Sequence, residues 1–271
     1  DEGETDADKY DTALTASMRD KNIEIILLDT NDETVVAKVK EHLVTAEGED
    51  LFRYSVVAPD PTLIKQTDLV TLATTVDSDR IFIPGNAFVD ADGNTVKSVL
   101  TATGLASAIM TEKLDPALPM NGVQIRGFAG VSRMMLASEM DVLVNSGITP
   151  LYNDGGLPTI YRLVTSDIDE GKIWQEGTTR FIADYTLETV QNTLRDRYKR
   201  TKNVIRILDS IRTTVKSTLE TLEGLEIIEN FDASTLTVVK DPSDLYGALI
   251  DYEFDVVTPL YTITINQHMK L

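Results

Sequence analysis

Hydrophobic and polar positions in the first half of the chain alternate between short buried-strand patterns and longer helical patterns. Three such strand and helix pairs cover residues 23–42, 54–76 and 80–113. The first helix is predicted to open with a capping box at residues 30–33, where Thr30 precedes Glu33 by three positions. Repeated units of this kind predict a small, mostly parallel α/β subdomain over residues 20–115.

The segment 115–122 interrupts this periodicity with two prolines and a glycine, so we place a domain boundary there. Beyond it, residues 153–156 carry the turn sequence Asn-Asp-Gly-Gly, which predicts a hairpin. Helical patterns follow at 179–198 and 202–222, and the remaining patterns are extended. The second part, residues 122–271, is therefore predicted to be an α+β domain that ends in a β-strand arm at 260–271.

The start of the chain is strongly acidic. Positions 1–8 carry five carboxylates and no base, so we expect residues 1–19 to form a solvated, poorly ordered lead-in. The sequence opens without methionine, and we expect it to be a piece of a longer subunit.

The composition excludes several classes of partner. The chain has 44 acidic and 25 basic residues, a net charge of −19, which repels phosphate backbones and anionic membrane surfaces. We therefore expect no nucleic acid partner. No run approaches the roughly 18 apolar residues that span a bilayer, so no membrane insertion is expected. The absence of cysteine excludes disulfides and thiolate metal sites, and it fits folding in a reducing cytosol.

No catalytic or ligand-binding motif stands out. The chain contains no GxxxxGK[ST], GxGxxG, HExxH or GxSxG pattern. His42, on a predicted polar helix face, and His268 have no metal ligand at suitable spacing. Residues 90–94 fit a hairpin turn better than a calcium loop, because Thr101 stands where the loop needs a glutamate. We thus expect no enzyme activity, no cofactor, and no catalytic, cofactor-binding or metal-ligating residues.

One alternative is an enzyme of the α/β class that binds a small ligand. In such a protein the ligand would lie at the carboxyl ends of the first three strands, near Asp29, Ala58 and Pro84. A well-formed pocket there would favour this alternative.

A basic cluster is the most unusual local feature of so acidic a chain. Eight bases fall within 22 residues, opposed only by Asp196 and Asp209: Arg195, Arg197, Lys199, Arg200, Lys202, Arg206, Arg212 and Lys216. On the second long helix, an apolar stripe is predicted to face the core: Val204, Leu208, Ile211, Val215, Leu219 and Leu222. The bases then face solvent or an acidic partner surface, which could belong to another copy of the chain.

The terminal strand pattern at 260–267 alternates strongly and follows Pro259. Its alternate residues Tyr261, Ile263 and Ile265 are candidate contacts. The strand either pairs within its own sheet or is an arm that completes the sheet of a neighbouring molecule.

The order of elements in the second half resembles the C-terminal region of tail sheath proteins, the subunits of contractile phage tails and related contractile injection systems. The segments that carry the resemblance are 145–149, 158–165, 180–185, 206–211, the helix that ends at 222–224, and 261–265. In the first half, only the α/β character and the helix at 102–108 are similar to the family.

This resemblance implies a structural role. Sheath subunits form a helical polymer of identical copies around an inner tail tube protein, and terminal arms add strands to adjacent subunits. The sheath contracts to drive the tube through a cell envelope, without catalysis or cofactor. It also implies residence in a virion tail or phage-like particle that is assembled in the bacterial host cytoplasm. A non-contractile scaffold or adhesion module is a third alternative.

Overall fold

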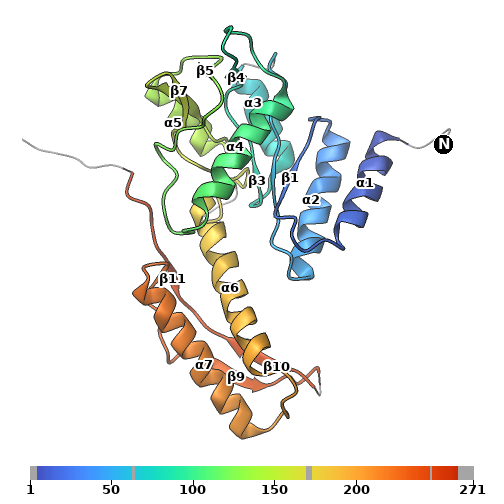
Figure 1. Ribbon diagram of the computed structural model, residues 1–271, viewed down its shortest axis with the longest axis vertical. Coiled ribbons are helices and arrows are strands. Elements are labelled where there is room, and N and C mark those ends of the chain that lie inside the picture. The colour runs from blue at the N-terminus through green and yellow to red at the C-terminus, as the bar shows by residue number, and fades with distance from the viewer. Residues whose placement is uncertain (1–4, 63–64, 169–172, 245, 262–271) are drawn as a thin grey trace, which may run out of the picture.

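The computed structural model describes residues 5–62, 65–168, 173–244 and 246–261. A body, which contains the parallel sheet, is joined by one long helix, α6 (Gly177–Arg197), to a separate distal lobe (Figure 1). The mixed fold predicted from the sequence, α/β elements followed by α+β elements, is confirmed.

The parallel sheet of the body has the order β1 (Ile25–Leu27), β2 (Tyr54–Val56) and β3 (Ile81–Phe82). Helices α2 (Glu33–Gly48) and α3 (Gln66–Val76) cover one face, and α4 (Ser98–Glu112) covers the other. Neighbouring residues on a strand point to opposite faces, so Phe82 packs toward α4 while Ile81 packs toward α2 and α3. All three predicted strand and helix pairs are therefore present.

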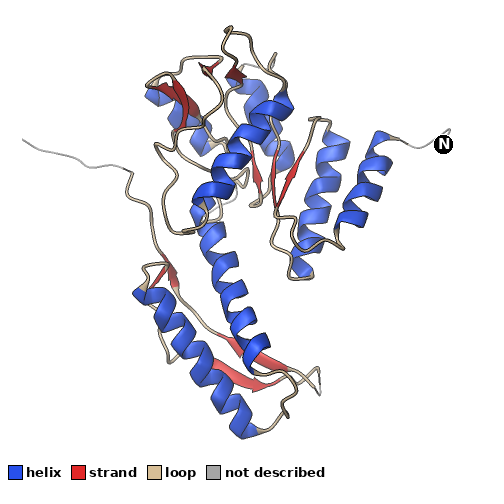
Figure 2. Cartoon of the chain, viewed as in Figure 1, coloured by secondary structure: helices blue, strands red, loops and turns tan. Residues whose placement is uncertain are grey.

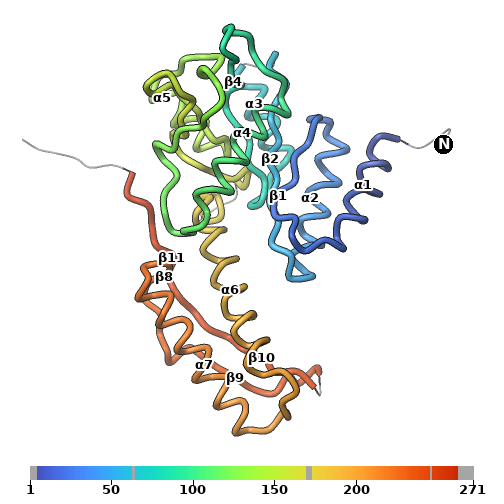
Figure 3. Tube along the Cα trace, in the orientation of Figure 1, coloured from blue at the N-terminus to red at the C-terminus, as the bar shows by residue number. Residues whose placement is uncertain are grey.

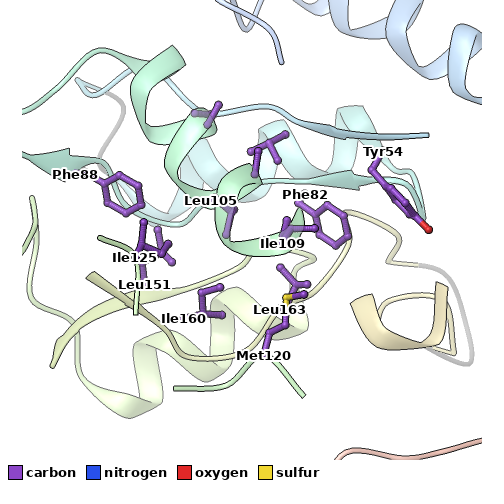
Figure 4. Close-up of a cluster of buried hydrophobic side chains, with 14 of the residues drawn as sticks. Tyr54, Phe82, Phe88, Leu105, Ile109, Met120, Ile125, Leu151, Ile160 and Leu163 are labelled. Atoms are coloured by element: carbon purple, nitrogen blue, oxygen red, sulfur yellow. The ribbon is translucent and has the colours of Figure 1, made fainter. Parts of the chain in front are cut away.

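The rest of the body consists of short strands and one helix. These are β4 (Phe88–Val89), β5 (Gly130–Val131), α5 (Ala137–Asn145), β6 (Leu151–Asp154) and β7 (Leu157–Ile160). One core cluster joins Leu105 and Ile109 of α4 to Met120, Ile160 and Leu163 (Figure 4). This core extends across the predicted boundary at 115–122. The division into domains at that segment remains a prediction.

Two predicted hairpin turns are present. β6 pairs with β7 in antiparallel register, and Gly155 (φ 58°) and Gly156 (φ 84°) occupy the left-handed region that this tight turn requires. At residues 90–94, the backbone N–H of Asn94 donates to the Asp90 carboxylate at 2.8 Å, and Val89 bridges to Thr95. The Asp90 carboxylate thus caps its own turn.

The expectation of a poorly ordered acidic lead-in is wrong for most of that segment. Residues Asp6–Ser17 form helix α1, which packs against α2. A capping box between Thr5 and Asp8 opens the helix, and Tyr10 and Leu14 lie against the core beneath α2 and α3. Helical spacing of a few apolar residues, supported by a cap, therefore outweighs the acidic composition.

Helix α2 differs from the sequence prediction in two details. Asp32, rather than Thr30, is its N-cap, and the Asp32 carboxylate accepts hydrogen bonds from the backbone of Thr34 and Val35. His42 is buried, because α1 covers the side of α2 that was predicted to be polar. Its Nε2 lies 2.9 Å from Nη1 of Arg53. Burial, together with the Arg53 charge, lowers the pKa of His42.

The distal lobe consists of residues 198–244 and 246–257, packed along α6 from Ile182 onward. Helix α7 (Ile205–Gly224) runs back along α6, and strands lie against this pair (Figure 2). β9 (Thr237–Lys240) pairs with β10 (Ala248–Asp251), and β8 (Ile228–Glu229) pairs with β11 (Asp255–Val256), both antiparallel. A core cluster of its own, built around Ile182, Val215, Leu219 and Ile228, holds the lobe together.

Candidate functional site

The basic cluster begins where α6 ends, in the part of the distal lobe far from the body, and continues along α7 as far as Lys216 (Figure 3). All eight of its side chains are exposed. The predicted apolar stripe of α7 faces the lobe core, as expected, through Leu208, Val215, Leu219 and Leu222. Val204 is an exception: it is the N-cap residue and is 44% exposed.

Few of these bases have an acidic partner. Lys199 pairs with Asp196 at 2.9 Å, and Lys216 pairs with Glu220 at 3.6 Å, both at the surface. Within the described ranges, the remaining six form no ion pair with a carboxylate: Arg195, Arg197, Arg200, Lys202, Arg206 and Arg212. Arg195 donates a hydrogen bond to Asn192 at 3.3 Å. The cluster is therefore a largely unneutralised positive surface.

The predicted C-terminal arm begins at a specific contact with the rest of the chain. The Tyr261 hydroxyl donates to Oε1 of Glu176 at 2.6 Å, and the guanidinium of Arg162 lies 4.4 Å from the centre of the Tyr261 ring. Nε and Nη2 of Arg162 donate to Oε2 of Glu176 at 2.9 and 2.8 Å. Ile263 and Ile265, the other two candidate contacts, lie outside the described residues.

Burial shapes the electrostatics of this contact. Glu176, the N-cap of α6, is 8% exposed, and burial raises its pKa although Tyr261 and Arg162 oppose the shift. Burial, followed by the charge of Glu176, raises the pKa of Tyr261. The tyrosine thus stays a neutral hydrogen-bond donor. Glu176 and Arg162 anchor the chain at the point from which the predicted arm leaves.

A second charged site, which the sequence analysis missed, is buried where α6 passes the amino-terminal ends of β2 and β3. Asp184 on α6 accepts hydrogen bonds from Arg80 Nη1 at 2.7 Å and Nη2 at 2.9 Å. The Tyr54 hydroxyl donates to the same carboxylate at 2.6 Å. Arg180, one helical turn before Asp184, lies 3.0 Å from it. Arg80 and Asp184 are almost completely buried. Their bidentate ion pair therefore fixes both the position and the orientation of α6.

Two further carboxylates complete this ionic cluster. Glu47, at the end of α2, pairs with both Arg80 and Arg180, and Asp79 pairs with Arg180 at 2.8 Å. The cluster therefore ties α6 to α2 and to the segment that enters β3. The i, i+4 pair Arg180 and Asp184 was visible in the sequence, but Arg80 is about 100 positions away, and only folding brings it into contact.

The ionic cluster should make stability depend on pH. Burial raises the pKa of Glu47, but hydrogen bonds and charge from Arg80 and Arg180 outweigh it, and the pKa is lowered from its ordinary 4.5. The stabilisation that the ionised Glu47 contributes is fully present above pH 4.5. It is lost as pH falls through the lower pKa that Glu47 has in the folded state.

Glu47→Gln should therefore lower the free energy of unfolding by about 1 kcal/mol at neutral pH. It should also make the loss of stability below pH 4.5 less steep. Urea titrations between neutral and acidic pH would measure both effects. Glu49→Gln, at an exposed position just beyond α2, is the matched control. A pH profile identical to that of the unsubstituted chain would contradict this role.

The structure gives no support to the small-ligand alternative. Beside the carboxyl ends of β2 and β3, the hollow lined by Pro59 and Gly85 measures about 10 Å³, room for roughly one water molecule. A larger groove of about 390 Å³ lies between α6 and the body, but Glu24, Lys113 and other residues of both charges line it. Within the described ranges, no three His, Cys, Asp or Glu side chains are arranged to hold a metal ion.

The sequence predicts no membrane insertion, because no apolar run approaches the length that spans a bilayer. Among the parts of the chain that the structure describes, none of the helices is both long and apolar enough to cross a membrane.

Comparisons with protein families cover almost the whole chain. The family model for the phage tail sheath protein central domain matches residues 3–166, and the model for the phage tail sheath C-terminal domain matches residues 169–270. No curated protein matches the chain.

Solved structures share the fold at low sequence identity. The sheath tail protein of Listeria innocua superposes with a TM-score of 0.75 at 15% identity, over 94% of this chain and 58% of that chain. That of Desulfitobacterium hafniense gives 0.71 at 14% identity, over 94% and 61%. The helical sheath of the anti-feeding prophage in its contracted state gives 0.69 at 13%, over 98% and 75%. The chain thus spans about three fifths of the two bacterial sheath tail proteins.

Proposed function

Because this chain belongs to the phage tail sheath family, we propose that it is a structural subunit of a contractile tail sheath. Copies of the chain polymerise around an inner tail tube, and contraction of the polymer drives the tube through a cell envelope. The observation that carries this proposal is the match of two consecutive sheath domain models to nearly the full length of the chain.

The proposed role is mechanical and does not involve catalysis. A contracting sheath has two lattices that differ in the contacts between subunits, and each subunit turns as a rigid unit between them. The buried pairing of Arg80 with Asp184 supports this role, because it ties α6 to the body. The distal lobe, whose core includes residues of α6, would then move together with the body.

The partners that follow from this role are other copies of the chain and an inner tail tube protein. Neither nucleic acid nor membrane insertion has a part in it. The particle is a virion tail or a phage-like injection device, and assembly takes place in the cytoplasm of a bacterial host. The hydrogen bond from Tyr261 to Glu176 supports the proposal of a C-terminal arm. It holds the chain at Tyr261, and the arm would extend from there.

Negative-stain electron microscopy of the purified chain over a range of concentrations tests the proposal. Sheath subunits should form hollow tubes or stacked rings of uniform diameter. Particles without a central channel would indicate a scaffold of another kind. A chain that remains monomeric at every concentration would contradict self-assembly.

A further inference from the structure

The charges of α7 are arranged opposite to the helix dipole at both of its ends. A helix is stabilised by acidic side chains in its first turn and by basic side chains in its last turn. In α7 the first turn contains Arg206 and no acid, while the last turn contains Glu223 and no base. The stability of α7 itself therefore does not explain this distribution. Arg195 and Arg197 in the last turn of α6 do follow the dipole rule, so only the charges of α7 lack this explanation.

Four glutamates in the last turns of α7 and in the residues that follow it, up to Glu229 of β8, form an acidic surface, which we call the acidic end of α7. Glu220, Glu223, Glu226 and Glu229 follow one another at intervals of three residues, and the sequence has no base between Lys216 and Lys240. Three of these glutamates line a hollow of about 480 Å³. Glu220 pairs with Lys216, and Glu223 accepts a hydrogen bond from the Phe231 backbone. Glu226 and Glu229 are exposed and have no ion-pair partner among the described residues.

The first half of α7 carries the complementary charge, with Arg206 in the first turn and Arg212 six residues further along. Arg206 and Arg212 are exposed, and neither pairs with a carboxylate within the described ranges. At about 1.5 Å per residue, Arg212 lies roughly 18 Å from the last residue of α7 and Arg206 lies further away, so these arginines do not neutralise the acidic end within one molecule.

Some acidic residues elsewhere on the chain already have partners within the chain. On α1, Asp6 pairs with Lys9 and Asp8 caps its own helix. On α2, Asp32 is the N-cap and Glu41 pairs with Lys38. The acidic end of α7 combines unpaired carboxylates with a hollow that could receive side chains.

We propose that Arg206 and Arg212 of one copy bind the acidic end of α7, at Glu226 and Glu229, in a second copy. This contact joins two different surfaces of the same chain. It is therefore heterologous, and repetition without closure builds an open helical polymer. The inference rests on the proposed self-assembly and names the surfaces that carry out part of it.

Two charge-reversed variants test this contact. Arg206→Glu/Arg212→Glu and Glu226→Lys/Glu229→Lys should each raise the concentration required for association by about tenfold or more, because like charges then face each other. An equimolar mixture of the two should associate again, because each reversed end meets a reversed end of the other variant. Lys65→Glu/Lys97→Glu, which changes net charge by the same amount and sign as the arginine variant at exposed positions away from α7, is the control for that variant.

Sedimentation velocity should report the mass of the associated species, and electron microscopy should report its form. Recovery only in the mixture establishes the contact. If the arginine variant associates weakly and the mixture does not restore association, Arg206 and Arg212 bind another surface. That result would overturn the proposal. If the unsubstituted chain associates without forming tubes, the sheath function fails, while the mixture still decides the contact. A chain that never associates contradicts both.

Discussion

Removal of residues 260–271 should abolish polymerisation while leaving a folded monomer. The terminal pattern has strong β character, and we expect it to add a strand to a neighbouring subunit. Loss of backbone hydrogen bonds along a whole strand at every contact of the polymer should leave no tubes or rings in electron micrographs. Circular dichroism and thermal unfolding of the monomer would show whether the fold persists.

Two truncated chains separate the contact of Tyr261 within its own chain from the role of the residues after it. A chain that ends at Tyr261 keeps the contacts with Glu176 and Arg162, whereas a chain that ends at Pro259 loses them. Both should fail to polymerise. The shorter chain should in addition lose about 1 kcal/mol of stability, because the buried Glu176 carboxylate loses a hydrogen bond.

Two outcomes would contradict the prediction that residues 260–271 pair with a neighbouring subunit. Tubes formed by the chain that ends at Tyr261 would show that residues 262–271 are not needed between subunits. Unfolding of that chain would show that these residues complete its own fold. Tyr261→Phe in the full chain is a useful control, because it removes only the hydroxyl that donates to Glu176.

Asp184→Asn should lower the free energy of unfolding by about 3 kcal/mol, the largest effect on stability that we expect from one substitution. The carboxylate balances two buried guanidinium groups, of Arg80 and Arg180, and accepts a hydrogen bond from Tyr54. Loss of the Asp184 charge leaves buried positive charge, and among the described residues only Glu47 and Asp79, both partly exposed, pair with these guanidinium groups.

Urea denaturation monitored by far-ultraviolet circular dichroism would measure this change. Glu188→Gln, one turn further along α6 at an exposed position, should change stability by less than about 0.5 kcal/mol. The double variant Arg80→Met/Asp184→Leu should cost less than the sum of its single substitutions, because it leaves neither partner buried alone. If Asp184→Asn matches the Glu188→Gln control, the ionic cluster does not hold α6 to the body.

The sequence by itself determined the local elements, because each follows from neighbouring residues. Alternation and helical spacing located all three strand and helix pairs, and Gly155 and Gly156 located the hairpin between β6 and β7. The order of such elements in the second half was enough to identify the sheath family, which the family comparisons confirm.

Composition was a poorer guide than spacing at the acidic start of the chain. The carboxylates suggested disorder, but Tyr10 and Leu14, on one face of a capped helix, hold α1 against the body. His42 was assigned to a polar face for a related reason, since the sequence of α2 alone does not reveal that α1 covers it.

Tertiary structure alone decided which charged groups meet. Arg80, Asp184 and Glu47 belong to different elements, and nothing in their local sequence links them. Glu176 and Tyr261 are 85 positions apart. Local patterns reflect the periodicity of one helix or strand, whereas a buried ion pair depends on how distant elements pack. For the same reason, the sequence located the basic cluster of α6 and α7, but the structure was needed to place it in the distal lobe, on the side far from the body.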